Sequence, residues 1–271
     1  MKRNGKRIVV KIGSRLLTSN QGGVNHEMIS SLARQISKLK KRGYEVMLVS
    51  SGAIAAGMGV LGKTKRPQGL ADLQVCASIG QPVLMGAYQE VFAQFGLCSA
   101  QILVTSWDLD SRSLYKNARA TVEALLGLGN CVPIFNENDA LSFEEIAMLN
   151  RFGDNDMLSA QVALLAEASS LIILTSVDGL RTNSKGGRLI YEVNKIDKRI
   201  ESYAGGAESE LSVGGMASKL NTAKLMMKEG IPMHIVDGRI NGIIGDVLKG
   251  HKVGTLFVTK TSGNRKKVNA K

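Results

Sequence analysis

The stretch IVVKIGS, residues 8–14, predicts a buried strand that ends in a tight turn, because a β-branched run is followed by a Gly-Ser pair. A second run, EVMLV at residues 45–49, is followed in the same way by SSG at residues 50–52. Between the two runs, apolar residues at helical spacing predict a helix that begins at Asn25 and ends before Gly43. Strand, helix and strand in this order indicate a parallel β-α-β unit.

The same alternation continues along the rest of the chain. Further strands are expected at residues 101–104, 131–135, 171–174, 232–236 and 255–258, and further helices at residues 70–95 with an interruption at Pro82, 113–126, 156–168 and 216–229. Parallel strands need crossover helices, so the sequence predicts an α/β fold, a three-layer α/β/α sandwich with a mostly parallel central sheet. Residues 178–188 and 205–215 are candidate mobile loops.

The composition is that of a globular protein, with 44% hydrophobic and 21% charged residues. The formal net charge of +12 raises the possibility of nucleic-acid binding. However, the tails at residues 2–7 and 260–271 contain nine of the twelve excess positive charges, which leaves an excess of three in the body. Solvated basic tails are common, so this distribution disfavours a nucleic-acid partner.

Three cysteines, Cys76, Cys98 and Cys131, are far apart and have no histidine at metal-ligand spacing. We interpret them as core residues of a reduced cytoplasmic protein without a metal site of its own. The basic amino end precedes only three apolar residues before Lys11, and no stretch reaches the ~18 apolar residues of a membrane helix. We therefore expect neither a secretory segment nor contact with a membrane.

Small or polar residues follow several of the predicted strands, at residues 13–14, 51–52, 136–139 and 175–179. Ligands of α/β sheets bind beyond the carboxyl ends of the strands, where backbone N–H groups and helix N-termini favour anions. With Lys11 beside the first of these turns, the sequence predicts a phosphate or carboxylate site. Taken alone, Lys11 is also compatible with a strand-end lysine that extends into solvent.

Residues 57–64 match the P-loop pattern letter for letter, but their context disagrees with it. A P-loop leaves a strand and opens a helix. Here the preceding strand ends near Ser50, residues 53–56 are helix-prone, and Pro67 follows too soon for a long helix. We interpret this stretch as the end of a helix followed by a basic surface loop.

A series of motifs in fixed order is more specific: VVKIGS at 9–14, VSSGAIAAG at 49–57, IGQ at 79–81, NEND at 136–139, FGDND at 152–156 with LSA at 158–160, VDGL at 177–180, GGM at 214–216 with Lys219, and GTLF at 254–257. With these motifs the chain resembles the amino acid kinase family, and within it the branch that phosphorylates free glutamate.

The resemblance implies one domain over residues 1–258, in which residues 1–170 bind glutamate and residues 171–258 bind ATP, with a basic tail at residues 259–271. It implies ATP-dependent phosphorylation of the glutamate side-chain carboxylate to L-glutamyl 5-phosphate, the first step of proline biosynthesis, with proline as inhibitor. It also implies a homo-oligomer formed through the amino-terminal region. Many family members carry a further PUA domain, and this chain resembles the short form without it.

For catalysis, the resemblance implies that Lys11 and Lys219 supply positive charge and that Asp154 holds the two lysines in place. Magnesium would be bound through the nucleotide phosphates. Glutamate would be bound by Ser51, Asp139 and Asn155, with Asn136 and Asp156 as further contacts. From the residues alone, Asp139 is also compatible with a turn or helix-cap aspartate, and residues 154–156 with a helix N-terminus.

The implied nucleotide contacts are Lys11, Thr175, Ser176, Val213, Gly214, Gly215, Met216, Ala217, Ser218 and Lys219. Three positions depart from the family pattern: Ser176 replaces an aspartate, Val213 replaces a threonine and Arg181 replaces a tyrosine or similar residue. Arg15, where a serine is common, adds a charge near the site. Two alternatives stay open, another amino acid kinase branch acting on a different carboxylate or phosphate, and a non-catalytic basic module that binds nucleic acid.

Overall fold

The structure is a computed structural model that describes residues 5–19, 23–141, 155–183, 187–205 and 215–259. Within these ranges, strands and helices alternate as the sequence predicts. None of the helices described there combines the length and the apolar character needed to cross a bilayer.

Eight strands in the described ranges form one sheet. They are β1 (Arg7–Ile12), β2 (Glu45–Ser50), β3 (Cys98–Val104), β4 (Cys131–Glu137), β5 (Ser170–Thr175), β6 (Glu192–Val193), β7 (Met233–Asp237) and β8 (Thr255–Phe257). Their order across the sheet is β3-β4-β2-β1-β5-β7-β8-β6. Every neighbouring pair is parallel except β7 with β8, so the prediction of a mostly parallel sheet is confirmed.

Parallel pairing brings the carboxyl ends of β1, β2, β4, β5 and β7 to one edge of the sheet, which we call the carboxyl edge. In β1 and β2, Ile12 lies opposite Ser50, and both strands end there. The turns in which the sequence predicts a ligand site therefore lie along one line.

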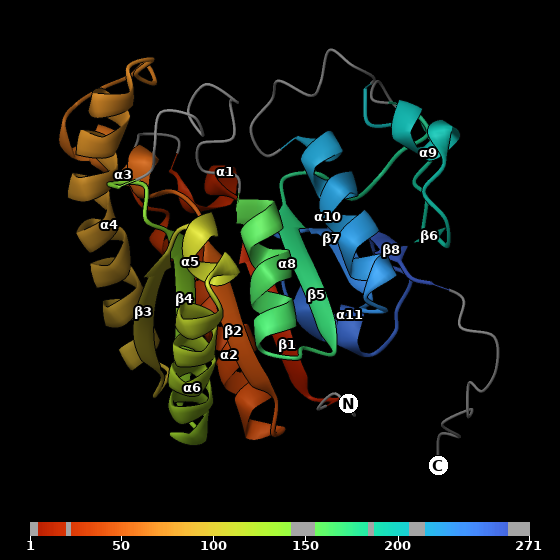
Figure 1. Ribbon diagram of the computed structural model, residues 1–271, viewed down its shortest axis with the longest axis horizontal. Coiled ribbons are helices and arrows are strands. Elements are labelled where there is room, and N and C mark those ends of the chain that lie inside the picture. Colours follow the sequence, from red (N-terminus) through yellow and green to blue (C-terminus); the bar gives the residue numbers. More distant parts are fainter. Residues whose placement is uncertain (1–4, 20–22, 142–154, 184–186, 206–214, 260–271) are drawn as a thin grey trace.

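Helices cover both faces of the sheet, which confirms the three layers (Figure 1). α2 (His26–Lys41), α4 (Leu70–Ala93) and α11 (Ile243–Leu248) enclose one core, and α6 (Arg112–Gly127), α8 (Asn155–Leu165) and α10 (Met216–Lys228) enclose the other. Shorter helices are α1 (Ser14–Leu17), α3 (Ala53–Val60), α5 (Ser106–Asp110) and α9 (Lys198–Ser202). Figure 1 shows α6, α8 and α10 in front of the sheet, α4 on the β3 side and α9 beside β6 at the opposite end.

Alternation along β1 decides which layer each side chain faces. Ile8, Val10 and Ile12 belong to the core with α2 and α4, whereas Val9 belongs to the core with α8 and α10. Successive strand residues point to opposite faces, so Lys11 points to the same face as Val9. Lys11 is therefore directed toward the layer that contains α8 and α10.

The predicted interruption at Pro82 is wrong, because α4 continues through it for 24 residues. Proline removes the N–H group that would bond to the carbonyl of Ser78. Both Ser78 and Pro82 lie on the exposed side of α4, so solvent can hydrogen-bond the carbonyl that is left without an intrahelical partner.

The predicted helix start at Asn25 is confirmed, because the Asn25 side chain caps α2 and accepts a hydrogen bond from the Met28 amide at 3.0 Å.

The interpretation of residues 57–64 is confirmed as well, since residues 57–60 end α3 and residues 61–66 are exposed. Sequence periodicity missed α1, α5, β6, α9 and α11, which have four, five, two, five and six residues and are too short to show a period. The candidate mobile loops fall partly on residues 184–186 and 206–214, outside the described residues.

Candidate functional site

A carboxylate between two lysines forms the centre of the carboxyl edge. Asp156 lies near the start of α8, and its Oδ1 and Oδ2 lie 2.6 Å from Lys11 Nζ and 3.0 Å from Lys219 Nζ. Lys11 comes from β1 and Lys219 from the first turn of α10, so three elements converge here. Asp156 is fully buried, and each lysine is only 4% exposed.

Burial by itself would raise the pKa of Asp156, but the charges of Lys11 and Lys219 and their hydrogen bonds outweigh it and lower that pKa below its ordinary value. The carboxylate is therefore ionised at neutral pH. It holds two ammonium groups at the place where the ends of β1 and α10 meet, which is a suitable position for binding a multiply charged anion.

A chain of amide side chains extends from this centre toward β4. Asn155 Nδ2 donates to the Ser50 carbonyl at 2.5 Å, to Ser51 Oγ at 3.2 Å and to Asn136 Oδ1 at 2.7 Å. Asn136 Nδ2 donates in turn to Gln81 Oε1 at 2.7 Å. The structure thus brings together three predicted substrate residues, Ser51, Asn136 and Asn155, and adds Gln81 to them.

Asp139 is the second buried carboxylate on this side, with 6% of its surface exposed. Its Oδ1 has no hydrogen-bond partner among the described residues. Desolvation raises the pKa of Asp139 to about 7, and the nearby charge of Arg66 only partly opposes this. A buried, unpaired carboxylate is costly unless a cationic ligand joins it.

Two predicted roles concern the acids of residues 154–156. The role of holding the lysines was assigned to Asp154, which lies outside the described residues, and Asp156 was assigned to substrate recognition. The structure places Asp156 itself between Lys11 and Lys219. Val213 and Gly214 also lie outside the described residues.

On the other side of the centre, a cavity of about 540 Å³ lies beside the ends of β5 and β7. Ser176 and Met216, two of the predicted nucleotide residues, line it together with the apolar side chains of Val177, Leu180 and Tyr203. Gly215 is the N-cap of α10 and has no side chain that could cap the helix, and Ala217, Ser218 and Lys219 form its first turns. Thr175 ends β5.

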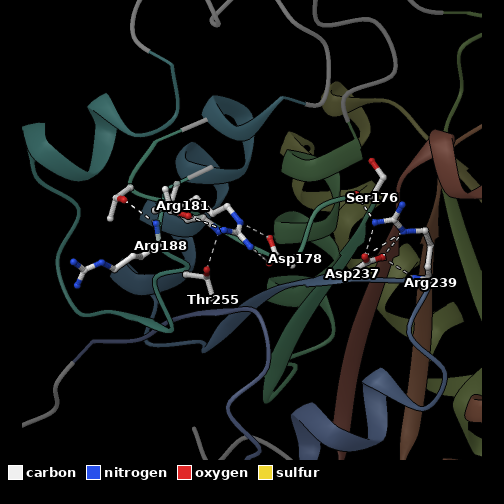
Figure 2. A network of polar contacts seen from close by, with 10 residues as sticks. Ser176, Asp178, Arg181, Arg188, Asp237, Arg239 and Thr255 are labelled. Carbon is white, nitrogen blue, oxygen red and sulfur yellow. Dashed lines mark hydrogen bonds and ion pairs between the residues drawn. The ribbon is translucent and has the colours of Figure 1, made fainter. Parts of the chain in front are cut away.

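Two arginine–aspartate pairs line the same cavity (Figure 2). Arg181 donates to Asp178 at 3.0 and 2.6 Å, and Arg239 donates to Asp237 at 2.6 to 3.2 Å and to the Ser176 carbonyl at 3.0 Å. Hydrogen bonds from the arginines lower the pKa of each aspartate. Asp237 and Arg239 were not predicted, because no local pattern distinguishes them from an ordinary strand end.

A second cavity, of about 650 Å³, shares Ser176 and Arg239 with the first and is lined by Arg15. Arg15 thus lies near the site, as the sequence suggests. The described residues include no group of three or more histidine, cysteine or acidic side chains that could hold a metal ion.

The chain is similar to known proteins of one family. Residues 6–237 match the model of the amino acid kinase family. A glutamate 5-kinase of Pelobacter propionicus is 46% identical over 93% of this chain and 68% of the relative, and one of Thermus thermophilus is 46% identical over 94% and 68%. One of Geobacter sulfurreducens is 46% identical over 97% and 70%.

The UMP kinase of Bacillus anthracis has a similar solved structure, with a TM-score of 0.58 over 94% of this chain and 97% of that chain. Its sequence is only 16% identical, so it supports the fold alone.

Proposed function

This chain belongs to the amino acid kinase family, and from that premise we propose that it transfers the γ-phosphoryl group of ATP to the side-chain carboxylate of L-glutamate. A carboxylate oxygen forms a bond to the γ-phosphorus, the bond from that phosphorus to the bridging oxygen of ADP breaks, and the products are L-glutamyl 5-phosphate and ADP. The glutamate 5-kinases at 46% identity support this choice within the family. This reaction opens proline biosynthesis.

The observation that supports the proposal most strongly is the cluster of Lys11, Asp156 and Lys219 at the carboxyl edge. The nucleophile, a carboxylate with an ordinary pKa near 4.3, is already ionised at neutral pH, so the reaction needs no general base. The barrier arises from repulsion between anions and from charge that spreads over the phosphoryl oxygens. Two ammonium groups in a buried site reduce both, and Asp156 holds them in position.

Recognition of free glutamate requires donors for its α-carboxylate and acceptors for its ammonium group. Asp139 and Asn155 each have a buried oxygen without a partner among the described residues, which suits an ammonium group. Ser51 and Asn136 fix Asn155 through its Nδ2 group. An acidic side chain on the amino-acid side favours a substrate that carries an amine over a simple dicarboxylate.

The nucleotide would occupy the cavity beside β5 and β7, with its base or ribose against Leu180, Tyr203 and Met216. Its phosphates would lie toward Gly215 and Lys219, where the backbone N–H groups at the start of α10 favour negative charge. Magnesium bound to those phosphates would neutralise charge that develops during transfer. Lys11 would reach the transferred group from the opposite side, from β1.

Three further expectations belong to this proposal: proline competes with glutamate, the chain forms a homo-oligomer through its amino-terminal region, and it acts in the cytoplasm. Millimolar proline in a glutamate titration tests the first of these. Inhibition that glutamate relieves supports it, and unchanged rates count against it.

The activity itself is tested by trapping the acyl phosphate with hydroxylamine, because the resulting hydroxamate is coloured with iron(III). Glutamate should give ATP-dependent hydroxamate, whereas aspartate and N-acetylglutamate should give little. Equal product from N-acetylglutamate would contradict recognition of a free amine, and no product from any of the three would contradict carboxylate phosphorylation. A salt-dependent gel shift with RNA tests the nucleic-acid alternative.

A further inference from the structure

The side-chain amides of Gln81, Asn136 and Asn155 form a hydrogen-bonded series, and backbone groups fix which atom of each amide is the oxygen and which is the nitrogen. A backbone N–H can only donate, and a backbone carbonyl can only accept. Asn136 Oδ1 accepts from the Glu137 backbone N–H at 3.0 Å, so the oxygen of Asn136 must face that amide. Its Nδ2 then faces Gln81 at 2.7 Å, and only the oxygen of Gln81 can accept this bond. At the other end, the Ser50 carbonyl requires a donor, so Nδ2 of Asn155 faces it.

This orientation leaves one donor and one acceptor without a partner at opposite ends of the hydrogen-bonded series. Gln81 Nε2 and Asn155 Oδ1 are buried and have no hydrogen-bond partner among the described residues. Gln81 is 8% exposed and Asn155 is 2% exposed. A buried polar group without a partner costs about 1–3 kcal/mol, so such atoms at a binding edge are expected to find their partners in a ligand.

Close packing holds Gln81 in place. It lies on α4 directly after Gly80, and a Cβ atom at Gly80 would collide with the Ala53 carbonyl oxygen of α3. This contact presses α4 against the first turn of α3, whose N-cap is Gly52 with a φ of 105° and no side-chain cap. The backbone of Gln81 is therefore held beside α3, and the hydrogen bond from Asn136 orients its side chain, so Nε2 is a positioned donor that favours an anion.

The sheet order gives the direction in which a substrate would lie. Gln81 contacts Asn136 at the end of β4, whereas Lys11 belongs to β1, and β2 lies between these strands. Strands are ~4.8 Å apart, so the two strand ends are separated by roughly 10 Å. An extended amino acid with a carboxylate at each end can span this separation if Lys11 and Gln81 each extend toward the space between the two strand ends. One carboxylate would then contact Lys11 and Lys219, and the other would contact Gln81.

We infer that Gln81 binds the α-carboxylate of the amino-acid substrate through Nε2, and that Asn155 Oδ1 and Asp139 accept hydrogen bonds from its ammonium group. The inference rests on the proposed function, because it assumes that the other carboxylate receives the phosphoryl group near Lys11. Gln81 then determines specificity by requiring a second carboxylate at a fixed distance from the first.

Gln81→Glu tests this assignment with little change of shape. The new side chain keeps an oxygen that accepts from Asn136 but replaces the donor with a second oxygen, which repels a carboxylate. The KM for glutamate should rise roughly 10- to 100-fold, the effect of losing a hydrogen bond to a charged group, and the KM for ATP should change little. Gln81→Met, which has no donor in any protonation state, should act in the same direction.

Gln89→Glu is the matched control, because Gln89 lies on the exposed side of the same helix and undergoes the same change of charge. It should leave both KM values within about twofold of the unaltered protein, the scale of ordinary surface substitutions. If it matches Gln81→Glu, a general charge effect replaces the inference.

Two glutamate analogues identify the group that Gln81 recognises. Glutarate lacks the amine, and 4-aminobutyrate lacks the α-carboxylate. As competitive inhibitors of the unaltered protein and of Gln81→Met, glutarate should lose affinity with the substitution, and 4-aminobutyrate should keep it. Equal losses for both analogues, or a loss for neither, would overturn the assignment. Absence of glutamate phosphorylation in the unaltered protein would overturn the proposed function instead, so the two failures are distinguishable.

Discussion

The two ends of the carboxyl edge satisfy their polar groups in different ways. At the end where we propose that the amino acid binds (the amino-acid end), Gln81, Asp139 and Asn155 are buried, and each leaves one polar atom without a partner in the described structure. At the end where we propose that the nucleotide binds (the nucleotide end), Asp178 pairs with Arg181 and Asp237 pairs with Arg239 at the surface of a cavity.

This difference indicates how each substrate is selected. Unpaired buried atoms impose a free-energy cost that only a ligand of matching shape and polarity removes, so the amino-acid end should discriminate sharply. Exposed ion pairs contribute little free energy and can rearrange, so the nucleotide end should tolerate substitution. The Lys11–Asp156–Lys219 cluster lies between the two ends, and in the proposed reaction it would contact both substrates.

Asp156→Asn should have the largest effect, because it leaves two buried ammonium groups without their carboxylate. Removing one partner of a buried ion pair costs about 3–5 kcal/mol, so the free energy of unfolding in urea should fall by that amount. The folded-state pKa of Asp156 is lowered, so its contribution is present above the unfolded pKa near 4 and is lost as the pH falls through the folded value. Asp110→Asn, at an exposed position, is the control, and an equal loss there would contradict the expectation.

Lys219→Ala should lower turnover by roughly 10²- to 10³-fold, the effect of losing one preorganised charge-stabilising donor. Lys228→Ala, at the exposed end of the same helix, should leave turnover unchanged. Steady-state rates at saturating glutamate and ATP make the comparison. Unaltered turnover in Lys219→Ala would remove this lysine from the mechanism.

Asp139→Asn should affect stability and substrate binding in opposite directions. In the folded protein the pKa of Asp139 is raised to about 7, so its ionisation destabilises the fold as the pH rises from 4 through 7. At pH 8 the variant should therefore unfold at higher urea concentration than the unaltered protein.

The same substitution should raise the KM for glutamate more than the KM for ATP, because an amide cannot supply the negative charge that an ammonium group favours. In the unaltered protein, kcat/KM for glutamate should rise with pH through about 7, and this dependence should be absent in Asp139→Asn. Equal changes in both KM values would argue against recognition of the amine.

Arg239→Ala should have the smallest effect, and it tests the contrast from the nucleotide end. The side chain is 62% exposed, and its bonds go to Asp237 and to the Ser176 carbonyl. The KM for ATP should change by no more than about fivefold, the range expected for an exposed ion pair, and the KM for glutamate should not change. An increase of a hundredfold for ATP would show that this pair anchors the nucleotide.

Much of the fold follows from the sequence, because buried parallel strands are short β-branched runs and the helices between them show a clear period. β1, β2, β4, β5 and β7 were all predicted within a few residues of their observed bounds. The elements that sequence analysis missed are short, and their placement depends on neighbours far along the chain. Tertiary packing likewise keeps α4 helical through Pro82.

Ordered motifs predicted Lys11, Ser51, Asn155 and Lys219 as candidate site residues, and the structure places all four at the carboxyl edge. The sequence was less informative where the direction of a side chain in the fold decides what it contacts. The motif alone does not show where the Asp156 side chain points, and only the fold shows that it lies between Lys11 and Lys219. Gln81 lies 55 residues before its partner Asn136, and only the fold shows that they touch.

The orientation of bound glutamate tests the central claim most directly. In a crystal structure with glutamate and a non-hydrolysable ATP analogue, the side-chain carboxylate should lie near Lys11 and Lys219, and the α-carboxylate should lie within about 3.2 Å of Gln81 Nε2. Glutamate bound the other way round, or at a place away from both Asp139 and Asn155, would contradict it.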